Sequence, residues 1–346
     1  MRGIGRFKSI AGKVRNRLIP GALILLYHRV AELTSDPQLL AVTPQHFAEH
    51  LQVIRNLGGP IRLQDLASGL KDNKVRRHGL VVTFDDGAAD NLVNAKPILE
   101  RHDVPATVFV ATGYTGSDVE FWWDELERLF LLPGQLPATL RLKVNEGILD
   151  LQLEGSSDYS ETDFKRHQNW NVLEPADPTT RHKAYRKLHE LLRPMTNTER
   201  SNSLVELREW SGQGITGRPT HRALTHSEIQ QLADGGLVEI GAHTVSHPVL
   251  SAITLETQEE EILRSRIELQ EIVGQPIMSF AYPYGTLEDY TSETVDLVRS
   301  MDFQCACSNF RGVVQPRTEI FELPRIVVRD WDGDEFERRV RKWFRE

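Results

Sequence analysis

Two adjacent carboxylates, Asp85 and Asp86, are the most prominent candidates for chemistry in this chain. Asp85 and Asp86 follow the apolar run 80–84 and stand directly before Gly87. Neighbouring negative charges at the end of a strand repel each other, so either a turn or a bound cation must account for them. Because Asp-Gly is also an ordinary turn sequence, the pair on its own leaves both interpretations open.

Two histidines could complete a site of this kind. His243 and His247 come directly after the apolar run 237–242. Their spacing lets both imidazoles bind one cation if the segment forms a helical turn, although two hydrogen-bonded surface histidines are the simpler interpretation of this pair alone. With one carboxylate added, two imidazoles leave coordination positions open for water and substrate, as in a catalytic divalent-metal site.

The elements that must position these residues follow from the hydrophobicity of the chain. Its apolar runs are continuous rather than alternating, which is typical of a parallel sheet covered by helices. Helical patterns at 44–58, 225–236 and 256–274 lie between the runs, and this alternation predicts a (β/α) barrel with chemistry at the C-terminal ends of its strands. The apolar runs are residues 22–27, 80–84, 106–110, 237–242, 277–282, 303–307 and 323–328.

A third polar stretch, "FAYPYG" at 280–285, also follows a predicted strand, and its ordinary interpretation is a Pro-Gly turn with aromatic packing. Together with "TFDDG" at 83–87 and "HTVSH" at 243–247, in this order, it resembles the polysaccharide deacetylases, the chitooligosaccharide-deacetylase homology domain of carbohydrate esterase family 4. The resemblance covers about residues 22–115 and 223–330. It implies a distorted (β/α) barrel, in agreement with the hydrophobic pattern.

The resemblance also implies roles for individual residues. Asp86, His243 and His247 would bind one divalent metal ion, and Asp85 would be the general base. The backbone around Tyr284 would help to stabilise the oxyanion. A mixed nitrogen and oxygen ligand set favours Zn²⁺, with other transition metals as alternatives.

Two positions depart from the family pattern. Ala281 stands where many members have an arginine that orients the base, and Leu323-Pro324-Arg325 stands where many have a Leu-x-His motif that supplies the general acid. Arg325 could pair with Asp85 in place of the missing arginine. His28, at the end of the first predicted strand, is the candidate acid; the alternative is a strand-end histidine held by the N-terminal region.

The implied reaction is metal-dependent hydrolysis of a linear amide, removing an acetyl or formyl group from an amino sugar. The substrate would be an N-acylated amino sugar, a sugar nucleotide or an oligosaccharide. The alternative is a non-catalytic carbohydrate-binding protein that retains the deacetylase barrel. The formal net charge of −8 over 346 residues is opposite to the basic charge typical of nucleic-acid-binding proteins, so we expect no nucleic-acid partner.

Residues 116–222 interrupt the strand–helix alternation, and we interpret them as a largely helical inserted subdomain over the active-site face of a barrel spanning 21–346. Trp122 and Trp123 beside Asp124 could form a platform for sugar, with Trp123 and Asp124 as the substrate-binding residues. The alternative is an amphipathic helix with core aromatics, which fits Trp122 better than Trp123. The remaining histidines show no convergent spacing and are expected at the surface; they include His182, His189 and His221.

Residues 1–20 carry only basic charges, with apolar residues at helical spacing. They could form a peripheral membrane-surface helix, a solvated tail or a helix docked on the barrel. The apolar run after them is too short to span a bilayer. Cys305 and Cys307 lie in an apolar stretch and are expected to be reduced thiols, so we expect a cytoplasmic protein, with peripheral contact at the inner membrane face as a further option.

Overall fold

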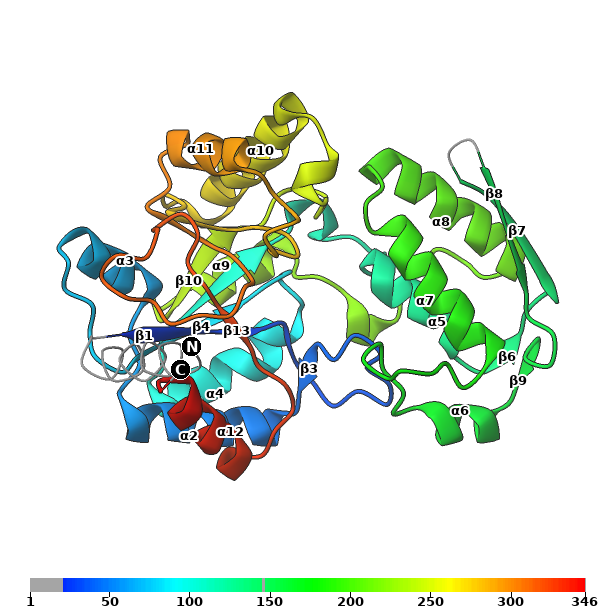
Figure 1. Ribbon diagram of the computed structural model, residues 1–346, viewed down its shortest axis with the longest axis horizontal. Coiled ribbons are helices and arrows are strands. Elements are labelled where there is room, and N and C mark those ends of the chain that lie inside the picture. Colours follow the sequence, from blue (N-terminus) through cyan, green and yellow to red (C-terminus); the bar gives the residue numbers. More distant parts are fainter. Residues whose placement is uncertain (1–20, 145–146, 346) are drawn as a thin grey trace, which may run out of the picture.

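A curled sheet of parallel strands lies at the centre of the larger lobe of the molecule (Figure 1). The computed structural model describes residues 21–144 and 147–345. Each apolar run identified in the sequence contains one strand of this sheet, and every pairing within it is parallel. In sheet order the strands are β12 (Cys305–Cys307), β11 (Ser279–Ala281), β10 (Val238–Ala242), β5 (Ala106–Val110), β4 (Gly79–Phe84), β1 (Ala22–Tyr27) and β13 (Ile326–Val327).

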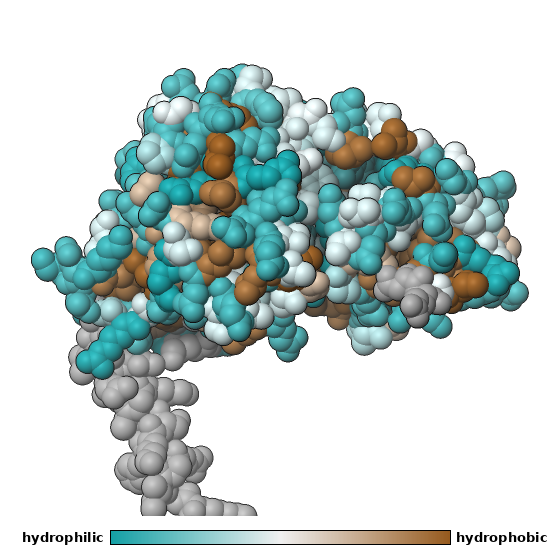
Figure 2. All heavy atoms as spheres, turned by 90° about the horizontal axis from the view of Figure 1, so that it is seen from above, coloured by the Kyte–Doolittle hydropathy of each residue, from teal (hydrophilic) through white to brown (hydrophobic). Residues whose placement is uncertain are grey.

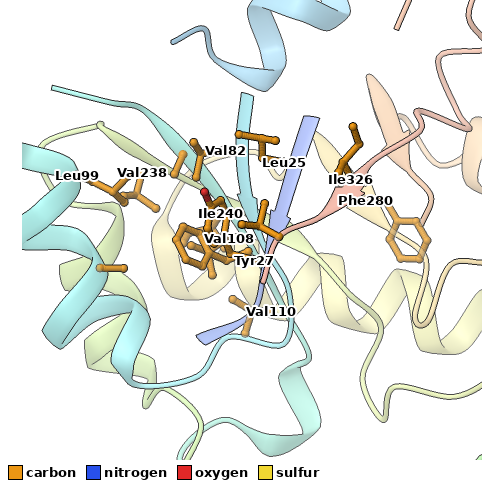
Figure 3. Close-up of a cluster of buried hydrophobic side chains, with 14 of the residues drawn as sticks. Leu25, Tyr27, Val82, Leu99, Val108, Val110, Val238, Ile240, Phe280 and Ile326 are labelled. Atoms are coloured by element: carbon orange, nitrogen blue, oxygen red, sulfur yellow. The ribbon is translucent and has the colours of Figure 1, made fainter. Parts of the chain in front are cut away.

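The two faces of the sheet bury different side chains, which explains why the strands read as continuous apolar runs. One face carries Leu25, Val82 and Val108 toward the surrounding helices, and Figure 3 shows this cluster gathered from successive strands. The opposite face carries Ile24 and Phe109, together with both cysteines, into the interior of the barrel. Burial on both faces is what a parallel sheet covered by helices requires.

The segment before β13 brings the two edges of the sheet together. Cys307 forms a parallel bridge with Leu323, and the Ala306 N–H donates to the Ile320 carbonyl at 3.0 Å. A few residues later the same segment pairs with β1 through Ile326. This arrangement confirms the distorted (β/α) barrel expected from the sequence.

Helices pack their apolar stripes against the outer face of the sheet. The predicted helix stops are present, since α2 ends at Gly58 and α10 ends at Gly274, whose φ is 68°. The predicted capping box of Thr225 and Glu228 is also formed. The helices are α2 (Pro44–Leu57), α4 (Lys96–His102), α9 (His226–Ala233), α10 (Leu255–Val273), α11 (Ser292–Ser300) and α12 (Gly333–Trp343), while α3 (Leu63–Lys71) packs on the interior cluster.

A second lobe beside the barrel is built from residues within 116–222 (Figure 1). Its helices surround a separate apolar core that includes Trp122, Phe130, Tyr185 and Leu207. The helices are α5 (Trp122–Leu131), α6 (Glu161–His167), α7 (Thr180–Leu192) and α8 (Asn197–Ser211). We refer to this second core and its helices as the insertion.

The insertion also contains antiparallel strands that the sequence analysis missed. Strands β7 (Thr139–Val144) and β8 (Gly147–Gln152) pair along their whole length, and β6 (Gly134–Gln135) pairs with β9 (Asp158–Tyr159). Leu140 and Leu142 are buried and alternate with exposed neighbours. This period-two pattern was the available signal.

The face of the molecule drawn in Figure 2 is mostly polar, with apolar side chains in small groups. Within the part of the chain that the structure describes, no helix is both long and apolar enough to cross a bilayer. Cys305 and Cys307 are free and buried. The predicted basic extension at 1–20 lies outside the described residues, so its membrane contact and the cytoplasmic address stay predictions.

Candidate active site

Residues from the first two sequence motifs converge where β4 and β10 end. Asp86, His243 and His247 place one ligand atom each within 4.8 Å of the other two. Asp86 Oδ1 lies 3.6 Å from His243 Nε2 and 3.4 Å from His247 Nε2. Ligands about 2.1 Å from one tetrahedral ion are separated by roughly 3.4 Å, so these three atoms fit a common cation.

Hydrogen bonds orient these ligands. The Nδ1–H of His243 donates to the Ala281 carbonyl at 2.7 Å, which directs Nε2 toward the carboxylates. The loop that carries His247 is braced by Glu261 of α10, whose carboxylate accepts from the backbone N–H groups of Val245 and Ser246 at 2.9 and 2.8 Å. Partners of this kind fix ring orientation and are typical of metal-binding histidines.

The backbone of all three motifs enters the left-handed region at residues other than glycine. The φ angles are 73° at Asp86, 54° at His247 and 59° at Tyr284, and Thr244 between the two histidines has 64°. Such conformations cost of order 1–3 kcal/mol each and cluster at functional sites. Their concentration here indicates that these loops are shaped for the placement of side chains rather than for stability.

Asp85 forms a bidentate ion pair inside the barrel. Arg325 Nη1 and Nη2 donate to the two oxygens of Asp85 at 2.7 and 2.6 Å, and its Nε–H donates to the Ser308 carbonyl at 2.8 Å. Burial alone would raise the pKa of Asp85, but the guanidinium of Arg325 and the nearby His243 hold this pKa below its usual value. Asp85 is therefore an oriented, ionised carboxylate 3.9 Å from His243 Nε2.

The titration of the remaining three groups reflects burial and mutual contact. Burial opposes ionisation of Asp86, yet its contacts with His243 and His247 lower its pKa. Burial lowers the pKa of His247 to about 3, whereas His243 has its pKa raised because the two carboxylates outweigh burial. A neutral imidazole beside an ionised carboxylate is the protonation state that divalent cations bind.

These residues lie in one cavity of about 290 Å³ formed by the barrel and the insertion together. His28, Trp123 and Tyr284 line it, so the structure brings these three candidates from the sequence into the same cavity as the candidate metal ligands. The ring of Trp123 lies 5.1 Å from that of His247, and the ring of Tyr284 lies 4.6 Å from it. The full lining comprises His28, Gln38, Leu40, Asp85, Asp86, Trp123, His189, Arg193, His243, His247, Tyr284, Thr286, Asn309, Val327 and Arg329.

Asp124 points elsewhere. Its carboxylate groups with Glu127 and His221, whose ligand atoms lie within 4.8 Å of one another, and it does not line the cavity. Successive side chains on a helix differ by about 100° in direction, so Asp124 and Trp123 face different ways on α5. Trp122 is fully buried in the core of the insertion, as the packing alternative predicted.

Several lining residues were not identified from the sequence. His189 was expected at the surface, but it packs 4.8 Å from the ring of Trp122 and lines the cavity. His182 and His221 are also buried, so the surface expectation is wrong for them too. Arg193 and Arg329 carried no motif at all. Only the position of Arg329 just after a barrel strand was a usable signal, because such residues face the active-site end.

The comparison with protein families agrees with this site. The family model for polysaccharide deacetylase matches residues 72–148 and 210–306, about half of the chain. The chain therefore belongs to the polysaccharide deacetylase family. A curated relative, YxkH of Bacillus subtilis, bears the name of a polysaccharide deacetylase and is 30% identical over 89 residues, a match that spans 25% of this chain and 30% of the relative.

Solved structures share the fold at low sequence identity. The Streptococcus pyogenes deacetylase PplD, in complex with acetate, has a TM-score of 0.57 at 17% identity, covering 92% of this chain and 98% of that one. IcaB from Ammonifex degensii has a TM-score of 0.55 at 18% identity, covering 94% and 98%. At these identities the similarity establishes a shared fold alone.

Proposed function

We propose that this protein is a metal-dependent hydrolase that removes an N-acyl group, acetyl or formyl, from an amino sugar. The observation that carries the proposal is the convergence of Asp86, His243 and His247 beside an Asp85 that is fixed by Arg325. This set provides three ligands of the types that Zn²⁺ favours and a separate carboxylate for proton transfer.

A divalent ion held by Asp86, His243 and His247 would polarise the amide carbonyl and lower the pKa of water. Asp85 then accepts the proton of the attacking water. Its bidentate contact with Arg325 leaves the carboxylate only one orientation and keeps it ionised near neutral pH. A base of this kind contributes about 10²–10⁴-fold to the rate.

Negative charge that develops on the carbonyl oxygen needs a hydrogen-bond donor. Among residues 21–144 and 147–345 no partner is found for the backbone N–H of Tyr284, which lies in a left-handed turn at the wall of the cavity. This N–H is the donor that we assign to the oxyanion.

The departing amine must be protonated before it can leave. His28 lines the same cavity, and both Asp85 and Asp86 act on its pKa, which burial nevertheless holds below the usual value. We assign the general acid to His28, in the place of the histidine that is absent at 325.

The test is incubation of the metal-loaded protein with N-acetyl and N-formyl amino sugars, their nucleotide derivatives and chitooligosaccharides, followed by quantification of acetate and formate. Release that disappears in His247→Ala is expected. Carbohydrate binding without release of either acid from any substrate would instead establish a non-catalytic binding protein.

A further inference from the structure

The charged groups of the cavity divide into two sets. Only Asp85 and Asp86 are acidic among its lining residues, and both are engaged within the site, one by Arg325 and the other by two histidines. The other charged lining residues are Arg193 and Arg329, both basic. The charged side chains that line the part of the cavity away from the two aspartates are therefore both basic.

Arg329 is a cation without an ion-pair partner in the described part of the chain. It follows β13 and donates through Nη1 to the carbonyls of Leu39 and Gln38. The acidic group that acts on it, Asp36, already accepts from the N–H groups of Leu40 and Ala41 at 2.9 and 2.8 Å. A half-buried guanidinium in this state is costly unless a ligand supplies negative charge.

Arg193 comes from the insertion and is held rigidly. It follows the last residue of α7, and its Nη2 donates to Asp289 Oδ1 of the barrel at 2.5 Å. Its guanidinium lies 4.3 Å from the centre of the Tyr284 ring, which in turn packs against His247. Asp289 occupies one edge of this guanidinium, so the remaining N–H groups can bind a ligand in the cavity.

His189 lies one helical turn before Arg193 and also lines the cavity. Burial lowers its pKa to about 4, so it is neutral near pH 7 and adds a hydrogen-bonding group without charge. Gln38 and Asn309 are further neutral polar groups of the lining. None of them offsets the two arginines.

We propose that Arg193 and Arg329 form a subsite for a phosphate group carried by the amino sugar whose N-acyl group reaches Asp85 and Asp86. The proposal rests on the function assigned above. Guanidinium groups match phosphate oxygens in charge and geometry, and two of them from separate elements can grip one phosphate from both sides. A neutral polysaccharide would leave Arg329 without a counter-charge. The substrate class is therefore a phosphate-linked N-acyl amino sugar.

The test compares four substrates that differ in charge: N-acetylglucosamine 1-phosphate, UDP-N-acetylglucosamine, neutral tri-N-acetylchitotriose, and N-acetylmuramic acid, which carries a carboxylate. We expect kcat/KM to be highest for one of the two phosphate compounds. Which of them is faster distinguishes a simple phosphate ester from a nucleotide. Arg193→Gln and Arg329→Gln should each lower kcat/KM for the phosphate compounds about tenfold or more, as loss of a charge-assisted hydrogen bond does.

Arg264→Gln is the matched control, because Arg264 is an exposed arginine of α10 that pairs with the exposed Glu260. It should leave every kcat/KM within about twofold, the usual result for an exposed pair. Equal losses on neutral and phosphorylated substrates in the two cavity variants would overturn the subsite. A wild-type preference for tri-N-acetylchitotriose or for the carboxylate compound would also overturn it.

A binding measurement separates this inference from the proposed function. Calorimetric titration with N-acetylglucosamine 1-phosphate and with N-acetylglucosamine needs no turnover. Tighter binding of the phosphate compound that is lost in Arg329→Gln would support the subsite even if no substrate were hydrolysed. Hydrolysis of neutral substrates with no charge-dependent binding would leave the proposed function intact and refute the subsite.

Discussion

The two walls of the cavity are built on different principles. The barrel wall consists of residues at strand ends that are fully buried and paired with each other, such as Asp85 with Arg325 and Asp86 with His243. The wall from the insertion consists of side chains on helices or directly after them, such as Trp123 and Arg193, that each contact the barrel. Chemistry requires fixed geometry, whereas recognition requires complementary shape and charge, and each wall meets one requirement.

The largest effect is expected from a substitution in the barrel wall of the cavity. In His247→Ala the cation loses one of three protein ligands, so both bound metal and hydrolysis should fall to background. Elemental analysis of purified protein gives the metal content, with about one divalent ion expected per unaltered chain. His226→Ala, at an exposed histidine on α9, is the control. Full metal occupancy in a His243→Ala/His247→Ala double variant would contradict the ligand assignment.

The next effect separates the two aspartates. Asp85→Asn should retain the metal, because Asp86 supplies the ligand, but should lower kcat about 10²–10⁴-fold through loss of the base. Asp86→Asn should lower metal affinity instead. Titration with metal and measurement of kcat at saturating metal distinguish the two variants, and an exchange of these phenotypes would reverse the assigned roles.

Removal of Arg325 tests the ion pair. In Arg325→Gln the carboxylate of Asp85 stays buried without its partner, which should destabilise the protein by about 3–5 kcal/mol in denaturant unfolding. Arg325 lowers the pKa of Asp85, so its loss should raise this pKa. The acidic limb of the kcat/KM profile should then move to higher pH, since only ionised Asp85 is a base. An unshifted limb would show that Arg325 does not act through Asp85.

His28→Ala should have a smaller effect. It should keep metal and fold but lower turnover by at least about tenfold, because the amine loses its proton donor. The lowered pKa of His28 places its titration on the acidic side of its ordinary value, so the fraction able to donate declines as pH rises through that lowered pKa. Near-normal turnover in this variant would remove His28 from the mechanism.

The smallest effect concerns the insertion wall. Trp123→Ala should raise KM several-fold and leave metal content unchanged, because its ring faces the cavity beside His247. Both rings are buried in the insertion core, but only that of Trp123 also lines the cavity. Trp122→Ala is therefore the matched comparison, and it should reduce stability by about 3–5 kcal/mol without a change in KM. Insoluble Trp123→Ala protein with unchanged KM in Trp123→Phe would assign Trp123 to packing.

The same contrast explains how much the sequence could predict. Each barrel strand is an apolar run buried on both faces, and a polar residue directly after such a run lies at the active-site end. The sequence alone was therefore enough to predict that Asp85, Asp86 and His243 lie together at the active-site end of the barrel. The roles of the neighbouring positions, Ala281 and Arg325, could be predicted only by comparison with the family pattern.

The insertion offers no comparable rule. His189 on α7 and Arg193 directly after it line the same cavity, but nothing in a helical pattern says whether a helix face meets solvent or another lobe. The role of Glu261 could not be predicted from the sequence either, because this residue of α10 contacts the loop that carries His247 only once the chain is folded. Long-range placement of this kind depends on how the two lobes pack.

The position of Arg325 has a consequence for how such enzymes are compared. Many relatives are expected to carry the orienting arginine at the position of Ala281, on β11, whereas here the guanidinium reaches the base from the segment that closes the barrel. A column-by-column alignment would score two lost catalytic residues. A comparison of charge positions in space would instead find the ion pair present, with its arginine supplied by another part of the chain. Inactive relatives are better sought among chains in which neither position supplies an arginine.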